Sequence, residues 1–163
     1  MSASSTVQKS DGMTYAPVGL AKPVCRPGEF NVAAVGLDHG HIYGMCNGLR
    51  EAGAEIKLVY DPDPARVAKF CQTYPGAEPA RNEQEILDAP DIHLVASAPI
   101  PCRRGPLGMR VLAHGKDYFT DKPPFTSLPQ LDEARKVTAA TNRKFAVYYA
   151  ERLHSEAAVH AGH

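Results

Sequence analysis

From residue 31 onward, short apolar runs alternate with amphipathic segments. A continuously apolar run is typical of a strand buried on both faces, and apolar residues three or four positions apart are typical of a helix face. The segment that contains Ile42, Met45 and Leu49 has the helical spacing. The pattern predicts strands at 31–37, 55–60, 92–98, 118–120 and 144–149, and helices at 41–52, 63–74, 83–87, 107–114 and 128–141.

The strict alternation of strand and helix predicts an α/β fold. Parallel strands need crossover connections, and right-handed crossovers through helices build a doubly wound, mostly parallel sheet of the Rossmann type with helices on both faces. In such a sheet a ligand binds beyond the carboxyl ends of the strands, where the strand order reverses. Candidate site residues are therefore expected in the turns that follow the strands.

The net charge narrows the class of ligand. Lys plus Arg and Asp plus Glu each number 18 in the 163 residues, so the formal net charge is zero. Nucleic acid and anionic membranes select surplus Lys and Arg, so we expect neither partner and predict a small-molecule ligand. No apolar run approaches the ~18 residues of a membrane span.

The cysteines and the N-terminal segment bear on location and domain organisation. The four cysteines lack zinc-site spacing, and we expect reduced thiols in a cytoplasmic protein.

Residues 1–30 are predicted to form a polar arm without the features of a signal peptide. Disorder is favoured for 1–12, whereas 13–30 could also pack across a neighbouring surface. Residues 31–150 are predicted to form one dinucleotide-binding domain.

The turn after the first predicted strand contains an altered phosphate-binding motif. The G-x-G-x-x-G fingerprint lets the backbone approach a pyrophosphate where a strand turns into a helix. Here Gly36 fits the first position, but Asp38 stands at the second and His41 at the third. A carboxylate at the second position would repel a pyrophosphate. Gly36, Gly40 and Gly44 could supply the close approach instead, so the motif alone indicates a dinucleotide only weakly.

Two charged residues follow other predicted strands. Asp61 follows 55–60, where an acidic side chain accepts from both ribose hydroxyls and disfavours a 2′-phosphate, so it favours NAD over NADP. The alternative is a plain turn residue of the run 61–64. Lys122 follows 118–120, where a half-buried lysine can move a proton or hold a hydroxyl. The alternative is an ordinary surface lysine.

The cluster Asp38, His39 and His41 leaves several interpretations open. Imidazole and carboxylate groups bind metals, which keeps a metal-dependent enzyme as one hypothesis. The spacing indicates no further ligand, so we predict no metal. The remaining alternatives are a cofactor or substrate contact in the crevice, helix capping by Asp38, and simple turn chemistry.

Several short segments together resemble the glucose-fructose oxidoreductase and inositol dehydrogenase family (Gfo/Idh/MocA). The segments are 35–37, 59–64, 85–91, 98–99, 114–116 and 121–123. The most specific of them is Asp121-Lys122-Pro123, which is similar to the acidic-Lys-Pro signature of the family. The resemblance covers about residues 31–160.

The resemblance implies an oxidoreductase that transfers a hydride between a nicotinamide nucleotide and a sugar, polyol or related alcohol. It implies NAD or NADP as cofactor, of which Asp61 favours NAD, and Lys122 as the catalytic residue beside the nicotinamide. The expected cofactor contacts are Gly36, Asp38, His39, Gly40, His41, Asp61, Ala98, Pro99, Asp121, Lys122 and Pro123, and the expected substrate contacts are His41, Arg104 and Arg152.

The chain also departs from the family pattern. The glycine turn is altered, and 100–104 lacks a histidine that many members carry. Because family members continue into a substrate domain, we expect 151–163 to be the start of a domain that is missing here and this chain alone to turn over little. A homo-oligomer is compatible with the resemblance. The alternative function is a non-catalytic nucleotide-binding or sugar-ligand-binding module.

Overall fold

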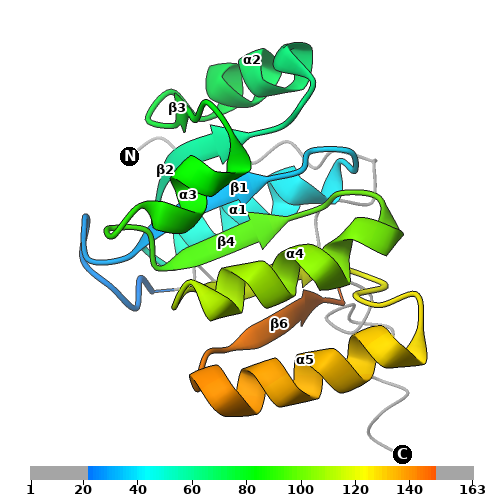
Figure 1. Cartoon of the computed structure of the whole chain (residues 1–163). Coiled ribbons are helices and arrows are strands. Elements are labelled where there is room, and N and C mark those ends of the chain that lie inside the picture. The colour runs from blue at the N-terminus through cyan, green and yellow to red at the C-terminus, as the bar shows by residue number, and fades with distance from the viewer. Residues whose placement is uncertain (1–21, 150–163) are drawn as a thin grey trace, which may run out of the picture. The chain divides into compact units, whose positions relative to one another are not determined.

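A computed structural model of the chain describes residues 22–149, which form a six-stranded sheet in which every pair of neighbouring strands is parallel (Figure 1). The strand order is β3-β2-β1-β4-β5-β6. This is the order of a doubly wound Rossmann sheet, so the predicted fold class is confirmed. The strands are β1 (Asn31–Val35), β2 (Glu55–Tyr60), β3 (Glu78–Pro79), β4 (Leu94–Ser97), β5 (Asp117–Asp121) and β6 (Phe145–Tyr148).

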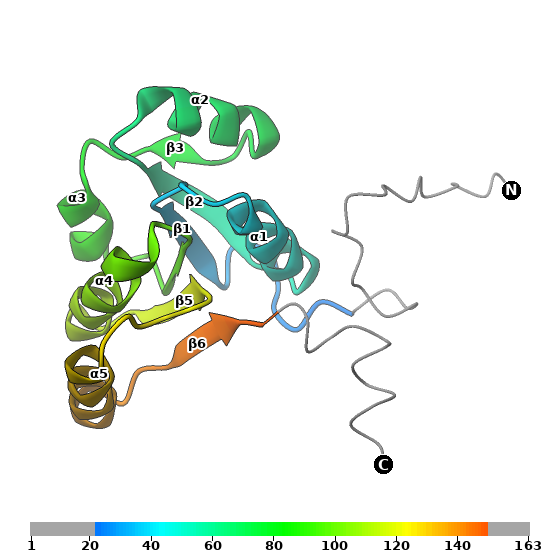
Figure 2. The ribbon, with the colours of Figure 1, turned by 90° about the vertical axis from the view of Figure 1, so that its right-hand side faces the viewer.

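Helices cover both faces of the sheet (Figure 2). They are α1 (His41–Glu51), α2 (Pro64–Thr73), α3 (Glu83–Asp88), α4 (Pro101–Ala113) and α5 (Leu128–Thr141). Side chains alternate across a strand, so Val32 and Ala34 of β1 belong to the core under α1 and α2. Ala33 and Val35 belong to the core under α3 and α4. The fully buried β1 therefore anchors two hydrophobic layers, which explains its uninterrupted apolar sequence.

Helix α4 begins at Pro101, well before the residue 107 that the apolar pattern predicts. Proline is favourable in the first turn of a helix, because the missing N–H would have no partner there. The buried positions of this first part are Arg104 and Gly105 rather than apolar residues. The first turns of α4 therefore lack apolar residues at helical spacing, and that spacing begins only at Leu107.

The described end of the N-terminal arm packs against the turn between α1 and β2. The main-chain N–H of Val24 donates to the carbonyl of Ala52 at 2.8 Å, and the Cys25 thiol donates to the same carbonyl at 3.4 Å. The rest of the predicted arm and the whole segment 151–163 lie outside the described residues. Within 22–149, no helix is long and apolar enough to cross a membrane.

Gly36 is the position in the first turn where only glycine fits. Its φ is +72°, and a Cβ atom built there would lie 2.8 Å from the Cβ atom of Pro99. We expect Gly36→Ala to lower the free energy of unfolding by about 1–3 kcal/mol, from backbone strain and this close contact. Gly40 is the matched control because its φ is −62° and nothing lies within 4 Å of an added Cβ.

Urea unfolding of the two variants checks this prediction. Gly40→Ala should stay within about 0.5 kcal/mol of the wild type. Equal stability of Gly36→Ala and Gly40→Ala would contradict the account of this turn.

Candidate functional site

The turn after β1 is fixed by hydrogen bonds to the ends of two neighbouring strands. The main-chain N–H of Gly36 donates to the carbonyl of Tyr60 at 3.0 Å, and the Gly36 carbonyl accepts from the N–H of Ala98 at 3.0 Å. The N–H of His39 donates to the Ala98 carbonyl at 3.0 Å. The turn therefore lies between β2 and β4, where the strand order reverses and a ligand is expected.

A cavity of about 470 Å³ opens beside this turn. Its walls come from the ends of β1 and β2, from the turn after β4 and from α4, with Glu83 at the start of α3. The lining residues are Val35, Gly36, Asp38, Tyr60, Pro62, Glu83, Pro99, Cys102, Arg103, Pro106, Leu107 and Arg110. Three of the predicted cofactor contacts, namely Gly36, Asp38 and Pro99, thus face one cavity.

Asp61 is buried behind the turn and holds its backbone. One carboxylate oxygen accepts from the N–H of Leu37 at 2.6 Å, and the other accepts from the N–H of Asp63 at 2.8 Å. Only 5% of Asp61 is exposed. The side chain therefore links the glycine turn to the start of α2, a role that sequence reasoning did not assign to it. Its contact with a ribose stays a prediction.

Arg66 explains how the glycine turn carries a carboxylate at its second position. The guanidinium donates to Asp38 at 2.5 Å and lies 3.6 Å from Asp61 and 3.5 Å from Asp63. The hydrogen bond to Asp38 raises the pKa of Arg66 above its usual value. One guanidinium thus faces three carboxylates, and the negative charge of Asp38 is directly paired.

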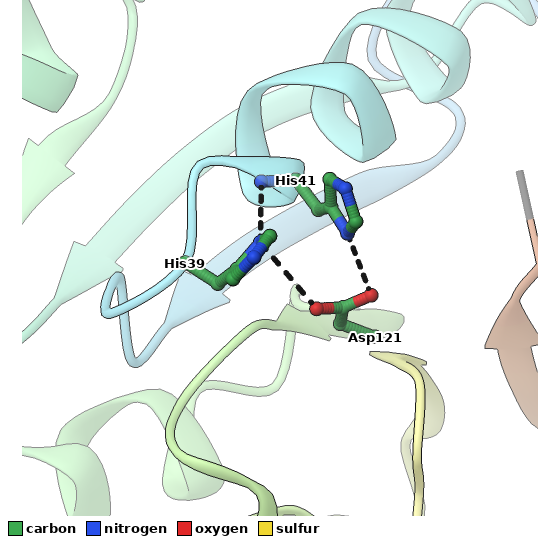
Figure 3. A group of neighbouring side chains, drawn as sticks. All are labelled: His39, His41 and Asp121. Carbon is green, nitrogen blue, oxygen red and sulfur yellow. Dashed lines mark hydrogen bonds and ion pairs between the residues drawn. The ribbon is translucent and has the colours of Figure 1, made fainter.

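A second cluster is centred on Asp121, at the end of β5 (Figure 3). One oxygen of the carboxylate lies 2.9 Å from Nδ1 of His41 and accepts from the N–H of Lys122 at 2.8 Å. The other oxygen accepts from Arg104 at 3.1 Å and lies 3.6 Å from Nδ1 of His39. The structure therefore brings together five predicted site residues from three chain segments: His39 and His41 after β1, Arg104 in α4, and Asp121 and Lys122 at the end of β5.

Arg104 is buried and bound to protein groups, with only 3% of its surface exposed. Besides Asp121, the guanidinium donates to the carbonyl of Pro99 at 2.8 Å and to the carbonyl of Lys122. It ties the ends of β4 and β5 to α4. A contact between Arg104 and a substrate stays a prediction, and Arg152 lies outside the described residues.

Lys122 follows this cluster directly. It is half-buried, and its peptide bond to Pro123 is cis. Both main-chain polar groups of Lys122 are engaged, because its N–H donates to Asp121 and its carbonyl accepts from Arg104. The point from which the lysine side chain projects is therefore fixed by the buried ion pair.

The candidate metal ligands in the structure differ from the cluster considered in the sequence. Asp38 pairs with Arg66, whereas Asp121 contributes a carboxylate near the two histidines. One ligand atom from each of His39, His41 and Asp121 lies within 4.8 Å of the others. Local spacing could not indicate this third group, because Asp121 lies 80 residues from His41.

Comparison with a family model identifies the region that carries the site. Residues 30–149 match the model described as "Oxidoreductase family, NAD-binding Rossmann fold" of Gfo/Idh/MocA proteins. No curated protein matches the chain.

Among solved structures, the chain is similar to a protein assigned as an oxidoreductase from Erwinia carotovora atroseptica SCRI1043. The identity is 44%, the TM-score is 0.77, and the match covers 82% of this chain and 40% of that one.

Two further structures share the fold and contain ligands. The WlbA dehydrogenase from Chromobacterium violaceum, in complex with NADH and UDP-GlcNAcA, has 19% identity and a TM-score of 0.70 over 83% of this chain and 39% of that one. The biliverdin reductase from Synechocystis sp. PCC 6803, in complex with biliverdin and NADP⁺, has 22% identity and a TM-score of 0.65. The match covers 76% of this chain and 39% of that one. The chain therefore spans about two fifths of the length of the structures it matches.

The ion pair between Arg104 and Asp121 makes a testable contribution to stability. Arg104→Met leaves the buried carboxylate without its charge partner, which we expect to lower the free energy of unfolding by about 3–5 kcal/mol. Arg103→Met is the matched control, because Arg103 is the exposed neighbour on the same helix. Urea unfolding followed by circular dichroism measures both. A loss of similar size in the two variants would show that the pair does not stabilise the site.

Proposed function

Because the chain belongs to the Gfo/Idh/MocA oxidoreductase family, we propose that it is the NAD-binding part of an enzyme that oxidises or reduces a sugar, polyol or related alcohol. The observation that carries the proposal is the cavity beside the glycine turn, at the reversal of strand order. The bound nucleotide would supply the hydride acceptor or donor. The proposed activity belongs to a protein that includes this chain, since the relatives are more than twice as long.

The charges around the turn suit a dinucleotide. The adenosine half would occupy the cavity between the ends of β1 and β2, and the pyrophosphate would face the N-terminus of α1. The first turn of α1 carries no acidic residue. Arg66 pairs with Asp38, so the carboxylate in the turn no longer presents an unbalanced negative charge to a pyrophosphate.

The same charges favour NAD over NADP. Asp38, Asp61 and Asp63 surround Arg66, so the carboxylates outnumber the guanidinium at the end of β2. This excess negative charge opposes a 2′-phosphate. Asp61 contributes to this negative charge from behind the turn, where its side chain is buried.

The substrate class and the location of the protein are also part of the proposal. A relative in complex with NADH and UDP-GlcNAcA supports a sugar-like substrate.

All four cysteines of the chain lie among the described residues and are free thiols, which supports a reducing cytoplasm.

Calorimetric titration with NAD and with NADP tests the cofactor preference. We expect NAD to bind at least about 10-fold more tightly, equivalent to about 1.4 kcal/mol. Asp38→Ser should narrow the difference, because it releases Arg66 to pair with the 2′-phosphate. In the double variant Asp38→Ser with Arg66→Met, the affinity for NADP should fall again. Tighter binding of NADP to the wild type would contradict the preference, and no binding of either nucleotide would contradict the cofactor assignment.

Lys122→Met tests the catalytic assignment in a protein that contains this chain together with its remaining domain. We expect the affinity for NAD to stay within about 3-fold and kcat to fall by about 100-fold, because the lysine no longer holds the reacting hydroxyl in position. Lys69→Met on α2 is the control for loss of a lysine charge. Unchanged kcat in Lys122→Met would contradict the catalytic role. NAD binding by the wild type without any hydride transfer would favour the non-catalytic module instead.

A further inference from the structure

We propose that His41 is an acid–base residue of the ligand crevice and that Asp121 is its positioning residue. The proposal rests on the proposed function for the identity of the ligand, but its geometric basis is independent of that function. Figure 3 shows the pair: the His41 ring, at the start of α1, points one nitrogen at the carboxylate at the end of β5. The two atoms are 2.9 Å apart.

The surroundings of Asp121 determine which nitrogen of His41 carries the proton. The carboxylate accepts from Arg104 at 3.1 Å and from the N–H of Lys122 at 2.8 Å. A carboxylate paired with a guanidinium has no proton to give, so Nδ1 of His41 must be the donor in their contact. The proton of the neutral ring is then on Nδ1, and Nε2 keeps its lone pair.

Asp121 is a rigid support for this arrangement. Its side chain is only 1% exposed, and Arg104, which holds it, is also buried. The side chain of His41, in contrast, is 24% exposed, so the ring lies at the boundary between the buried pair and the solvent. A buried acceptor that orients a partly accessible imidazole is the arrangement that general-base chemistry requires.

His41 lies near the ends of β5 and β6, in the half of the sheet that would hold the nicotinamide end of a dinucleotide. In a doubly wound fold each half of a dinucleotide lies over one half of the sheet, and the adenosine half belongs to β1, β2 and β3. His41 contacts the end of β5 and lies with its ring centre 5.8 Å from that of Tyr148 on β6. The imidazole therefore belongs to the half where the reacting end of the nucleotide would lie.

A metal ion is the competing occupant of the same cluster, and the contacts disfavour it. Nδ1 of His41 and both oxygens of Asp121 already have partners, and Nδ1 of His39 accepts from the N–H of His41 at 3.2 Å. A divalent cation would displace these hydrogen bonds and lie next to the charge of Arg104. A proton on the imidazole needs no such rearrangement.

His41 would exchange a proton with the hydroxyl group of an alcohol substrate. In the oxidation of an alcohol, the hydroxyl proton moves to Nε2 of His41 while the carbonyl double bond forms. The C–H bond on the same carbon breaks, and a bound nicotinamide nucleotide would accept its hydrogen and electron pair as a hydride. In the reverse direction the imidazolium returns the proton to the carbonyl oxygen as the new C–H bond forms.

Nitrogen NMR of the ¹⁵N-labelled chain, in the presence of a chelator, tests the geometry without any cofactor. We expect the neutral His41 ring to give the signals of a protonated Nδ1 and an unprotonated Nε2. Asp121→Asn should change the tautomer populations while the backbone spectrum keeps the folded pattern. Asp117→Asn is the matched control, because Asp117 lies on the same strand and accepts instead from the N–H of Lys144.

Two NMR results would overturn the proposal. One is a wild-type His41 ring protonated on Nε2. The other is stoichiometric binding of added Zn²⁺, with the signals of His39 and His41 shifting together, since this would assign the cluster to a metal.

Carbethoxylation with diethyl pyrocarbonate, mapped by mass spectrometry, tests the accessible lone pair and its place in the crevice. We expect His41 to react in the wild type and to react at least about 10-fold more slowly in Asp121→Asn, because the carboxylate fixes the tautomer and raises the basicity of Nε2. Saturation of the wild type with NAD should also slow the reaction of His41. His114 is the control residue, because it lies at the C-terminal end of α4, whereas Arg104 is near the N-terminal end. It should react equally in all three samples. Equal reactivity of His41 with and without bound NAD would overturn the proposal. Absence of NAD binding in calorimetry would overturn the proposed function and leave the tautomer result standing.

Discussion

The buried ion pair between Arg104 and Asp121 is the interaction on which the rest of the site depends. Arg104 reaches from the second turn of α4 to the carbonyls after β4 and β5, and Asp121 reaches from β5 to the start of α1. Three chain segments that are distant in sequence thus share one pair of charges. Loss of either partner leaves a buried charge without compensation, so the pair holds Lys122 and His41 in place only as an intact unit.

The opposite side of the crevice depends on a different balance of charge. There a single guanidinium, that of Arg66, faces the carboxylates of Asp38, Asp61 and Asp63. The pair of Arg66 and Asp38 is more exposed than the pair of Arg104 and Asp121, so salt screens it more strongly. In the proposed function, the Arg104 network would support the reacting end of the nucleotide, and the Arg66 network would set the charge that an adenosine ribose meets.

Much of the fold could be predicted from the sequence, because the signals that specify it are local. The apolar run of β1, the helical spacing in α1 and the proline after Asp63 each follow from neighbouring residues. The start of α4 could not be predicted, because its first buried residues are Arg104 and Gly105.

The site was predictable as a set of strand ends but not as a set of contacts. The sequence analysis expected site residues in the turns after the strands, and the structure places the ends of β2 and β5 against the turn after β1 through Asp61 and Asp121. The pairing of His41 with Asp121, or of Arg66 with Asp38, joins residues 80 or 28 positions apart and has no local pattern. The buried position of Asp61 was equally invisible, since the same acidic residue suits a ribose contact and a backbone anchor.

The central claim is that a nicotinamide nucleotide binds where the strand order reverses. Mapping of amide chemical shifts during titration of the chain with NAD tests it most directly. The account predicts that the largest shifts occur at Gly36, Asp38, His39, Gly40 and Ala98, around the turn that joins β1 to α1. Shifts confined to another surface, or no shifts at millimolar NAD, would contradict it.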